Sequence, residues 1–262
     1  MSKQQRRCFM RTNNICFPSE VRAKIVKCVE DAVKDDILAD IQHHSLRTTN
    51  SVPTRIWDLL NTNLARELET EDCTIADAHR GPWQMLVVFD KTTQCILTFM
   101  REKRFAELRR FQRRRSHMHY LDMLTRQFNK RLLADQQQIE LYPHTFSDED
   151  RLPQLIQTLL HDLEDEIPVV QNHVLVLFET TGYQLSHIRA VKVTPNLDIA
   201  QDGSQDWSEY ISTNVSVVVE KVAHSDAPGN QPNRGLKLKS KAIARKKNGL
   251  QRKETQEIET QG

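Results

Sequence analysis

One segment of the chain carries far more positive charge than its surroundings. Residues 101–131 hold eleven lysines and arginines against three acids. Such a concentration of cations suits a phosphate backbone, because neutralising phosphates releases their counterions. The segment therefore predicts a nucleic-acid-binding surface, formed by Arg101, Lys103, Arg104, Arg109, Arg110, Arg113, Arg114 and Arg115. Two other interpretations stay open: a solvated helix face, or internal pairing with the acids of 148–150 and 162–166.

A second basic segment follows near the C-terminus, where residues 234–253 hold nine lysines and arginines and no acid. From Asn233 onward there are no aromatic and few large apolar residues, so we expect 224–262 to be a disordered extension. The alternative is a tail that only improves solubility. Cations that could hold DNA or RNA without sequence preference are Lys237, Lys239, Lys241, Arg245, Lys246 and Lys247.

Acidic residues near the predicted strands raise the alternative of a Mg²⁺-dependent nuclease. The predicted element order resembles the αβββαβ order of PD-(D/E)xK-type nucleases, whose carboxylates and lysine hold Mg²⁺ and activate water. The candidates are Asp90 or Glu67 together with Glu102 and Lys103. A hairpin that turns at 92–93 separates Asp90 from Glu102 by about 23 Å, at ~3.3 Å per residue. This spacing argues against a shared ion, and the sequence predicts no other metal site.

Three short strings place aromatic and polar residues around one end of the expected sheet. They are RIWDLLNTN, RGPW and MREKRF, which begin at residues 55, 80 and 100. The same hairpin register places Trp83 opposite Glu102, so the last two strings should meet. If the body of the protein has a site, we expect it here, formed by Arg55, Trp57, Asp58, Asn61, Arg80, Trp83 and Glu102. The alternative is structural: the tryptophans anchor the core, and Arg80 pairs with Asp58 or Glu102.

Hydrophobic periodicity predicts the elements that must position these residues. Apolar residues at helical spacing predict helices over 19–43, 53–68, about 102–134, 147–166 and, briefly, 206–211. The third helix should bend or be exposed at 113–115, where its apolar stripe fails, and a capping box at Ser147 should open the fourth. Apolar and β-branched runs predict strands over 73–79, 83–90, 95–101, 174–180, 183–194 and 215–222. This order indicates an α+β fold with a mostly antiparallel sheet of about five strands and helices packed on it.

The composition of the 262-residue chain bounds the class of protein. Hydrophobic residues make up 38% and charged residues 27%, as in ordinary globular proteins, and no apolar run could span a membrane. The net charge is +2, yet residues 1–233 carry 28 basic against 32 acidic side chains. Five cysteines without CxxC spacing favour a reducing cytoplasm. We expect a flexible N-terminus over 1–18, one α+β domain over 19–223 and the disordered basic tail.

The three strings resemble those of an uncharacterised bacterial family, found in genomes and mobile elements and carried as a domain of unknown function. The resemblance spans about residues 20–222, and the basic tail lies outside it. It implies a bacterial, cytosolic protein linked to phages or plasmids. It brings no catalytic assignment, so the prediction of function rests on the residues themselves.

The uneven charge favours a non-enzymatic protein that binds DNA or RNA backbones through the basic helix and the tail. It implies no membrane and no cofactor, with Mg²⁺ only under the nuclease alternative. A third hypothesis is an interaction protein, such as an inhibitor, an immunity factor or a phage–host adaptor, whose basic helix docks an acidic protein partner. The sequence assigns no catalytic residue.

Overall fold

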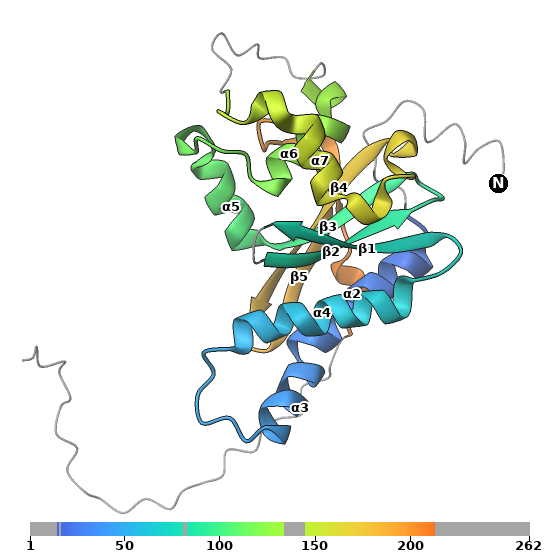
Figure 1. Ribbon diagram of the computed structural model, residues 1–262. Helices are drawn as coiled ribbons and strands as arrows, with labels where there is room; N and C mark the ends of the chain where they lie inside the picture. Colours follow the sequence, from blue (N-terminus) through green and yellow to red (C-terminus); the bar gives the residue numbers. More distant parts are fainter. Residues whose placement is uncertain (1–14, 16, 81–82, 134–144, 213–262) are drawn as a thin grey trace, which may run out of the picture. The chain divides into compact units, whose positions relative to one another are not determined.

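Six strands form one mixed sheet in the order β1-β2-β3-β4-β5-β6 (Figure 1). The computed structural model describes residues 15, 17–80, 83–133 and 145–212, without the side chains of residues 80 and 83. Neighbouring strands run antiparallel except β3 and β4, which are parallel because a long helical connection joins them. The strands are β1 (Cys73–Arg80), β2 (Trp83–Asp90), β3 (Cys95–Arg101), β4 (Asn172–Thr181), β5 (Gln184–Val193) and β6 (Ile199–Asp206).

Helices cover both faces of this sheet (Figure 1). One face carries α2 (Ser19–Val33) and α4 (Val52–Leu68), with α3 (Asp35–His43) packed against them, and the other carries α5 (Glu102–Arg110), α6 (Tyr120–Phe128) and α7 (Leu152–Leu159). Short 3₁₀ turns are η1 (Gln112–Arg114), η2 (Lys130–Leu133), η3 (Glu149–Arg151), η4 (His161–Leu163), η5 (Ile167–Val169) and η6 (Ser208–Tyr210). Within the described part of the chain, no helix is both long and apolar enough to cross a membrane.

The central strands are apolar throughout because each of their faces meets a helical layer. On β4, Val174, Val176 and Phe178 join the core beneath α2 and α4. The alternate residues Leu175 and Leu177 join the core beneath α5, α6 and α7. A strand that is buried on both faces reads as a continuous hydrophobic run, which is why the periodicity located it.

The predicted α+β class is confirmed, with six strands instead of about five. The additional strand β6 was not predicted because its sequence, IAQDGSQD, lacks apolar alternation; backbone pairing with β5 defines it. At the N-terminal end of the described region, Ile15 and Phe17 are buried in the core, inside the segment expected to be flexible. The predicted strand over 215–222 and the basic tail over 224–262 lie outside the described residues.

The long helix predicted over 102–134 is wrong: the chain forms α5, η1, α6 and η2 in its place. A buried carboxylate explains the break. Asp122 accepts hydrogen bonds from the Gln112 amide (2.9 Å) and the His119 backbone N–H (2.8 Å), and it pairs with the Arg115 guanidinium. These bonds fold the connection back on itself, so that α6 begins anew at Tyr120 with His119 as its N-cap.

Two further helices are shorter than predicted. The helix expected over 19–43 divides at Lys34, whose non-helical backbone separates α2 from α3. The helix expected over 147–166 is limited to α7 with flanking 3₁₀ turns. The capping box predicted at Ser147 does not form there, because the Ser147 hydroxyl donates to the Ser116 carbonyl (2.8 Å) instead. Local propensity placed these helices, and tertiary hydrogen bonds set where they end.

The β2–β3 hairpin is paired at one end only. Its register is the predicted one, with Asp90 opposite Cys95, but the ladder stops after three residue pairs, at Val88 and Leu97. Beyond that point β2 continues along β1, while β3 continues along β4. The sheet therefore divides between β2 and β3, and Trp83 does not pair with Glu102 as the sequence predicted.

At the paired end of the hairpin, buried polar groups bind one another. The Asp90 carboxylate accepts the backbone N–H groups of Thr92 (3.3 Å) and Thr93 (3.1 Å) and the Thr93 hydroxyl. Burial raises the pKa of Asp90 in spite of these bonds. Close by on β4, the fully buried His173 ring lies 2.8 Å from the Thr98 hydroxyl oxygen, and burial lowers the pKa of His173 to about 3. The ring is therefore neutral.

Candidate functional site

A cavity of about 420 Å³ lies where β2 and β3 separate. Residues 84–86 of β2 and 99–101 of β3 form its two strand walls. Because these stretches do not pair with each other, alternate residues of both strands direct backbone N–H and C=O groups toward the gap. The volume falls within the usual range for small-molecule sites, about 300–1,000 Å³. The divided sheet thus creates a space of ligand size that is lined partly by main chain.

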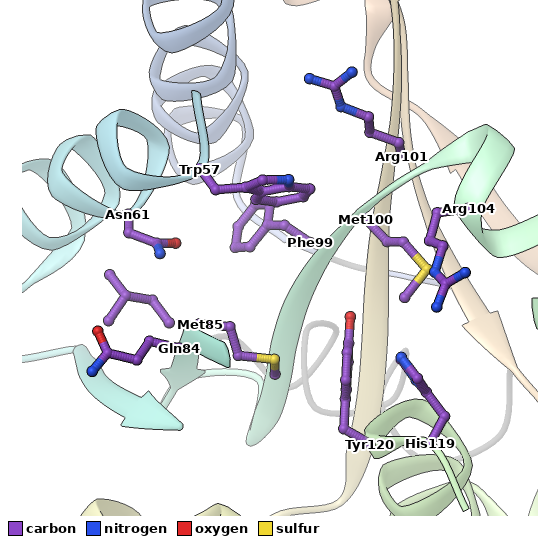
Figure 2. Close-up of a pocket in the computed structure, with 11 residues that line it drawn as sticks. Trp57, Asn61, Gln84, Met85, Phe99, Met100, Arg101, Arg104, His119 and Tyr120 are labelled. Atoms are coloured by element: carbon purple, nitrogen blue, oxygen red, sulfur yellow. The ribbon is translucent and has the colours of Figure 1, made fainter. Parts of the chain in front are cut away.

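Aromatic side chains close this cavity from two helical layers. Trp57 comes from α4 and Tyr120 from the start of α6, and in Figure 2 they approach from opposite sides. The Trp57 indole packs edge-on against the buried Phe178 ring, with centroids 5.6 Å apart. Tyr120 is 8% exposed and packs against the His119 ring at 4.3 Å. Flat, rigid faces of this kind suit a planar ligand.

Arg101 supplies a positive charge that no carboxylate of the described residues balances. Its guanidinium is half-buried at the cavity, and no carboxylate among the described residues pairs with it. Its Nε atom is buried without a hydrogen-bond partner, and burial lowers the pKa of Arg101. Burying an uncompensated charge is unfavourable, so such a group is expected to meet an anion.

A second cation, Arg104, lines the cavity from the first turn of α5. Figure 2 shows Arg104 on the His119 side of β3 and Arg101 on the Trp57 side. Arg104 is exposed, and its contact with Glu107 is long, at 3.4 Å. The cavity therefore has one guanidinium on each side of β3, the strand that forms one of its walls.

The basic segment predicted from the sequence divides into two groups. Arg109 pairs with Asp198 at the surface (2.5 Å), whereas Arg115 pairs with the fully buried Asp122 and so serves the fold. Arg126 likewise pairs with Glu149, within the acidic stretch considered for internal pairing. Exposed basic residues of the same segment include Lys103, Arg104, Arg110, Arg113 and Arg114 on or directly after α5, together with Arg109, Lys130 and Arg131.

Phe111 gives this exposed group a distinct character. It is 38% exposed, and it is the one aromatic among the exposed large hydrophobic side chains of the described residues. The guanidiniums of Arg110 and Arg114 lie over its ring, 5.3 and 5.5 Å from the centroid. We call Lys103, Arg104, Arg110, Phe111, Arg113 and Arg114 the α5 surface.

The surface site predicted around the three strings is partly assembled. Trp57 and Asn61 line the cavity, but Glu102 turns away to pair with Arg189 (2.5 Å). Arg55 pairs with Asp40 of α3, and Asp58 is exposed. The backbones of Arg80 and Trp83 face each other at the end of the β1–β2 ladder, and their side chains lie outside the described ones. The three strings therefore meet at one end of the sheet, but the residues that line the cavity there are only partly the predicted ones.

The carboxylates of the nuclease alternative do not converge. Asp90 lies at the paired end of the hairpin, and Glu102 follows the last residue of β3 at the other end. Glu67 is exposed on α4 and pairs with Arg66. Among the described residues, no group of three His, Cys, Asp or Glu side chains is placed to hold a metal ion. Asp90 and Glu102 therefore cannot share one.

Several cavity residues escaped the sequence interpretation. Met85, Phe99, Met100 and Tyr120 have the apolar character of core residues, and nothing local distinguishes them from the core. Nothing in the sequence indicated the role of His119, whose ring nitrogen accepts the Leu121 backbone N–H (3.2 Å) and caps α6. For the residues on the two strands, the signal that could have located them was the long run of apolar residues along β2 and β3 beyond the turn.

These features define an α+β protein whose divided sheet encloses a ligand-sized space between two helical layers. The chain belongs to a family of unknown function, DUF5986, whose model matches residues 14–257. The match confirms the resemblance to a domain of unknown function, but it corrects the bounds: the basic segment 234–253 lies inside the family region. No curated protein and no solved structure matches the chain.

Proposed function

We propose that this protein binds single-stranded nucleic acid along the α5 surface. The observation that carries the proposal is the exposed Phe111 ring with the guanidiniums of Arg110 and Arg114 near it, 5.3 and 5.5 Å from its centroid. Unpaired bases stack on aromatic rings and on guanidinium planes, whereas the bases of a duplex are already stacked. The neighbouring cations Lys103 and Arg104 supply charge for the phosphates.

The division of the basic residues supports this proposal. Arg109 and Arg115 have carboxylate partners. Arg110 and Arg114 instead lie over an exposed ring, where they keep charge and a flat face available to a ligand. An acidic protein would meet the charge equally well, but it would have no use for planar stacking groups.

The proposal includes a bacterial, cytoplasmic protein. Cys28, Cys73 and Cys95 are free thiols, buried within the described region, as expected in a reducing compartment. Burial raises the pKa of Cys28 to about 12 and that of Cys73 to about 11, so both thiols stay protonated and unreactive.

The test is fluorescence anisotropy of the full chain with labelled single-stranded RNA, single-stranded DNA and duplex DNA across a salt series. We expect single strands to bind more tightly than duplex, with affinity falling as salt rises. Phe111→Ala should weaken binding about 5- to 100-fold, as the loss of one stacked base implies. Leu38→Ala removes an equally exposed apolar side chain from α3 (Leu38 is 43% exposed) and should leave affinity unchanged.

Two results would contradict the proposal: unchanged binding by Phe111→Ala, or duplex binding as tight as single-strand binding. Polyglutamate is the control for an acidic protein partner. If it competes as well as the oligonucleotide and Phe111→Ala has no effect on its binding, the surface recognises acidic protein. Inclusion of Mg²⁺ in one arm tests for strand cleavage.

The basic tail enters the proposal as an additional source of phosphate contacts. A truncated protein, residues 1–226, lacks all nine cations of 234–253. We expect it to bind single strands more weakly and with a shallower salt dependence, because each lost phosphate contact reduces the slope by about 1. Equal affinity and slope for the two proteins would exclude a role for the tail.

A further inference from the structure

We propose that the cavity between β2 and β3 binds a single nucleotide unit, a planar base with its phosphate. The proposal does not use Phe111 or its flanking arginines, so it can be tested separately from stacking on Phe111, although Arg104 belongs both to the α5 surface and to the cavity lining. It begins from the division of the sheet, which leaves about 420 Å³ between two strands that pair elsewhere. Because Trp57 and Phe99 share one side of this space and Tyr120 occupies the other, a flat ring fits between apolar faces.

The phosphate is assigned by Arg101. Its guanidinium lies on the same side of β3 as Trp57 in Figure 2, half-buried and without a carboxylate partner among the described residues. Glu102, its neighbour along the chain, is already paired with Arg189 and offers no compensation. A guanidinium donates paired hydrogen bonds to phosphate oxygens, and the buried, unpartnered Nε of Arg101 is one of the donors that such a contact needs.

Polar groups for the base edge line the same space. Asn61 of α4 and Gln84 of β2 both line the cavity, and in Figure 2 the Asn61 carboxamide points toward it whereas that of Gln84 points outward from its rim. Neither forms a hydrogen bond to another described residue. Each offers one acceptor and two donors, and the unpaired main chain of β2 and β3 adds more. Planar walls, a cation and carboxamides together match a nucleotide better than an aliphatic anion.

Two sources could supply this ligand: a free mononucleotide, or one nucleotide of a strand held on the α5 surface. Isothermal titration calorimetry of the full chain distinguishes them, with AMP, GMP, CMP and UMP in one arm and a single-stranded oligonucleotide bearing a 5′-phosphate in the other. Adenosine is the control for the phosphate contact. Competition by AMP against the oligonucleotide shows whether both ligands enter the same cavity.

We expect at least one of these ligands to bind the wild-type protein, and Arg101→Gln to weaken that binding about 10- to 100-fold by removing charged hydrogen bonds. Arg47→Gln makes the same change at an exposed arginine outside the cavity lining and should have no effect. Adenosine should bind the wild type and Arg101→Gln equally weakly, because it lacks the phosphate.

A second pair of variants separates loss of the site from loss of the fold. Asn61→Phe places a ring in the cavity and should abolish nucleotide binding, whereas Thr62→Phe adds the same ring on the exposed side of α4 and should not. Thermal unfolding of each variant checks that the protein is intact. The proposal is overturned if no nucleotide and no phosphorylated strand binds, or if binding survives both Arg101→Gln and Asn61→Phe. Mononucleotide binding without affinity for single strands would keep this proposal and refute that of the α5 surface.

Discussion

The two ends of the β2–β3 hairpin differ in how their polar groups are satisfied. At the paired end, Asp90 accepts three hydrogen bonds from its own turn, and the neutral His173 contacts Thr98. At the divided end, Arg101 has no carboxylate partner and the Asn61 side chain forms no hydrogen bond among the described residues. The carboxylate at the paired end is thus bound within the protein, whereas the guanidinium at the divided end has no carboxylate partner among the described residues. A ligand is therefore expected at the divided end of the hairpin.

The largest effect is expected from removing the carboxylate that folds the α5–α6 connection. Asp122→Ala leaves the Arg115 guanidinium without its buried partner, and the four hydrogen bonds to the carboxylate from Gln112, Arg115 and the His119 backbone are lost. We expect a loss of about 3–5 kcal/mol in the free energy of unfolding, measured by urea denaturation. Because this connection positions Tyr120 at the cavity, nucleotide binding should fall as well. A loss below about 1 kcal/mol would contradict the structural role given to this pair.

A smaller effect is expected at the paired end of the hairpin. Asp90→Ala leaves the Thr93 backbone N–H and hydroxyl unsatisfied in a buried turn, which should lower stability by about 2–3 kcal/mol. Ligand binding at the divided end should not change, because three residue pairs separate the turn from the cavity. Urea denaturation tests the expected loss of stability, and nucleotide titration of the same preparation tests the expected unchanged affinity. A shift in affinity would show that the two ends are coupled.

Acid should weaken the paired end through His173. In the folded protein its pKa is about 3, whereas an unfolded histidine titrates near 6.5, so protonation favours the unfolded chain. The stabilising effect of the neutral ring is complete above pH 6.5 and is lost progressively as the pH falls toward 3. The expected contribution between pH 7 and pH 5 is about 2 kcal/mol. His173→Gln should reduce the dependence of unfolding free energy on pH in this range; parallel curves for the two proteins would contradict the assignment.

The smallest effect on stability should come from the divided end itself. Arg101→Gln removes a half-buried charge that has no carboxylate partner among the described residues, so the free energy of unfolding should change by less than about 0.5 kcal/mol or should rise. The same substitution is expected to reduce nucleotide binding strongly. A large loss of stability would mean that Arg101 serves the fold, and would remove the contrast between the two ends.

The sequence predicted the strands around the site closely. The ranges expected for β2 and β3 match those observed, α4 differs by one residue, and the hairpin register is correct. These elements were accessible because period-2 and period-3.6 patterns are local properties. The same holds for Trp57 and Asn61, which the strings pointed to and which line the cavity.

What the sequence could not show depends on contacts between distant residues. The end of the ladder at Val88 and Leu97 has no signal in the hydrophobic pattern, which continues along both strands beyond these residues. The break after α5 depends on Asp122, which reads locally as an ordinary helical residue. Among the basic residues, sequence alone did not distinguish Arg115, which is paired internally, from Arg101, which is not.

The three-pair seam between β2 and β3 has a mechanical consequence. It joins two stiff leaves, one formed by β1 and β2 and the other by β3 to β6, each held internally by long ladders. The three residue pairs at one edge can act as a hinge. About this hinge the two parts of the sheet could open by a small angle without breaking the hydrogen bonds within either part. Residues 84–86 belong to one leaf and residues 99–101 to the other. A molecule seated between them would set that angle, so occupancy of the site would be transmitted to the helices on both sides of the sheet.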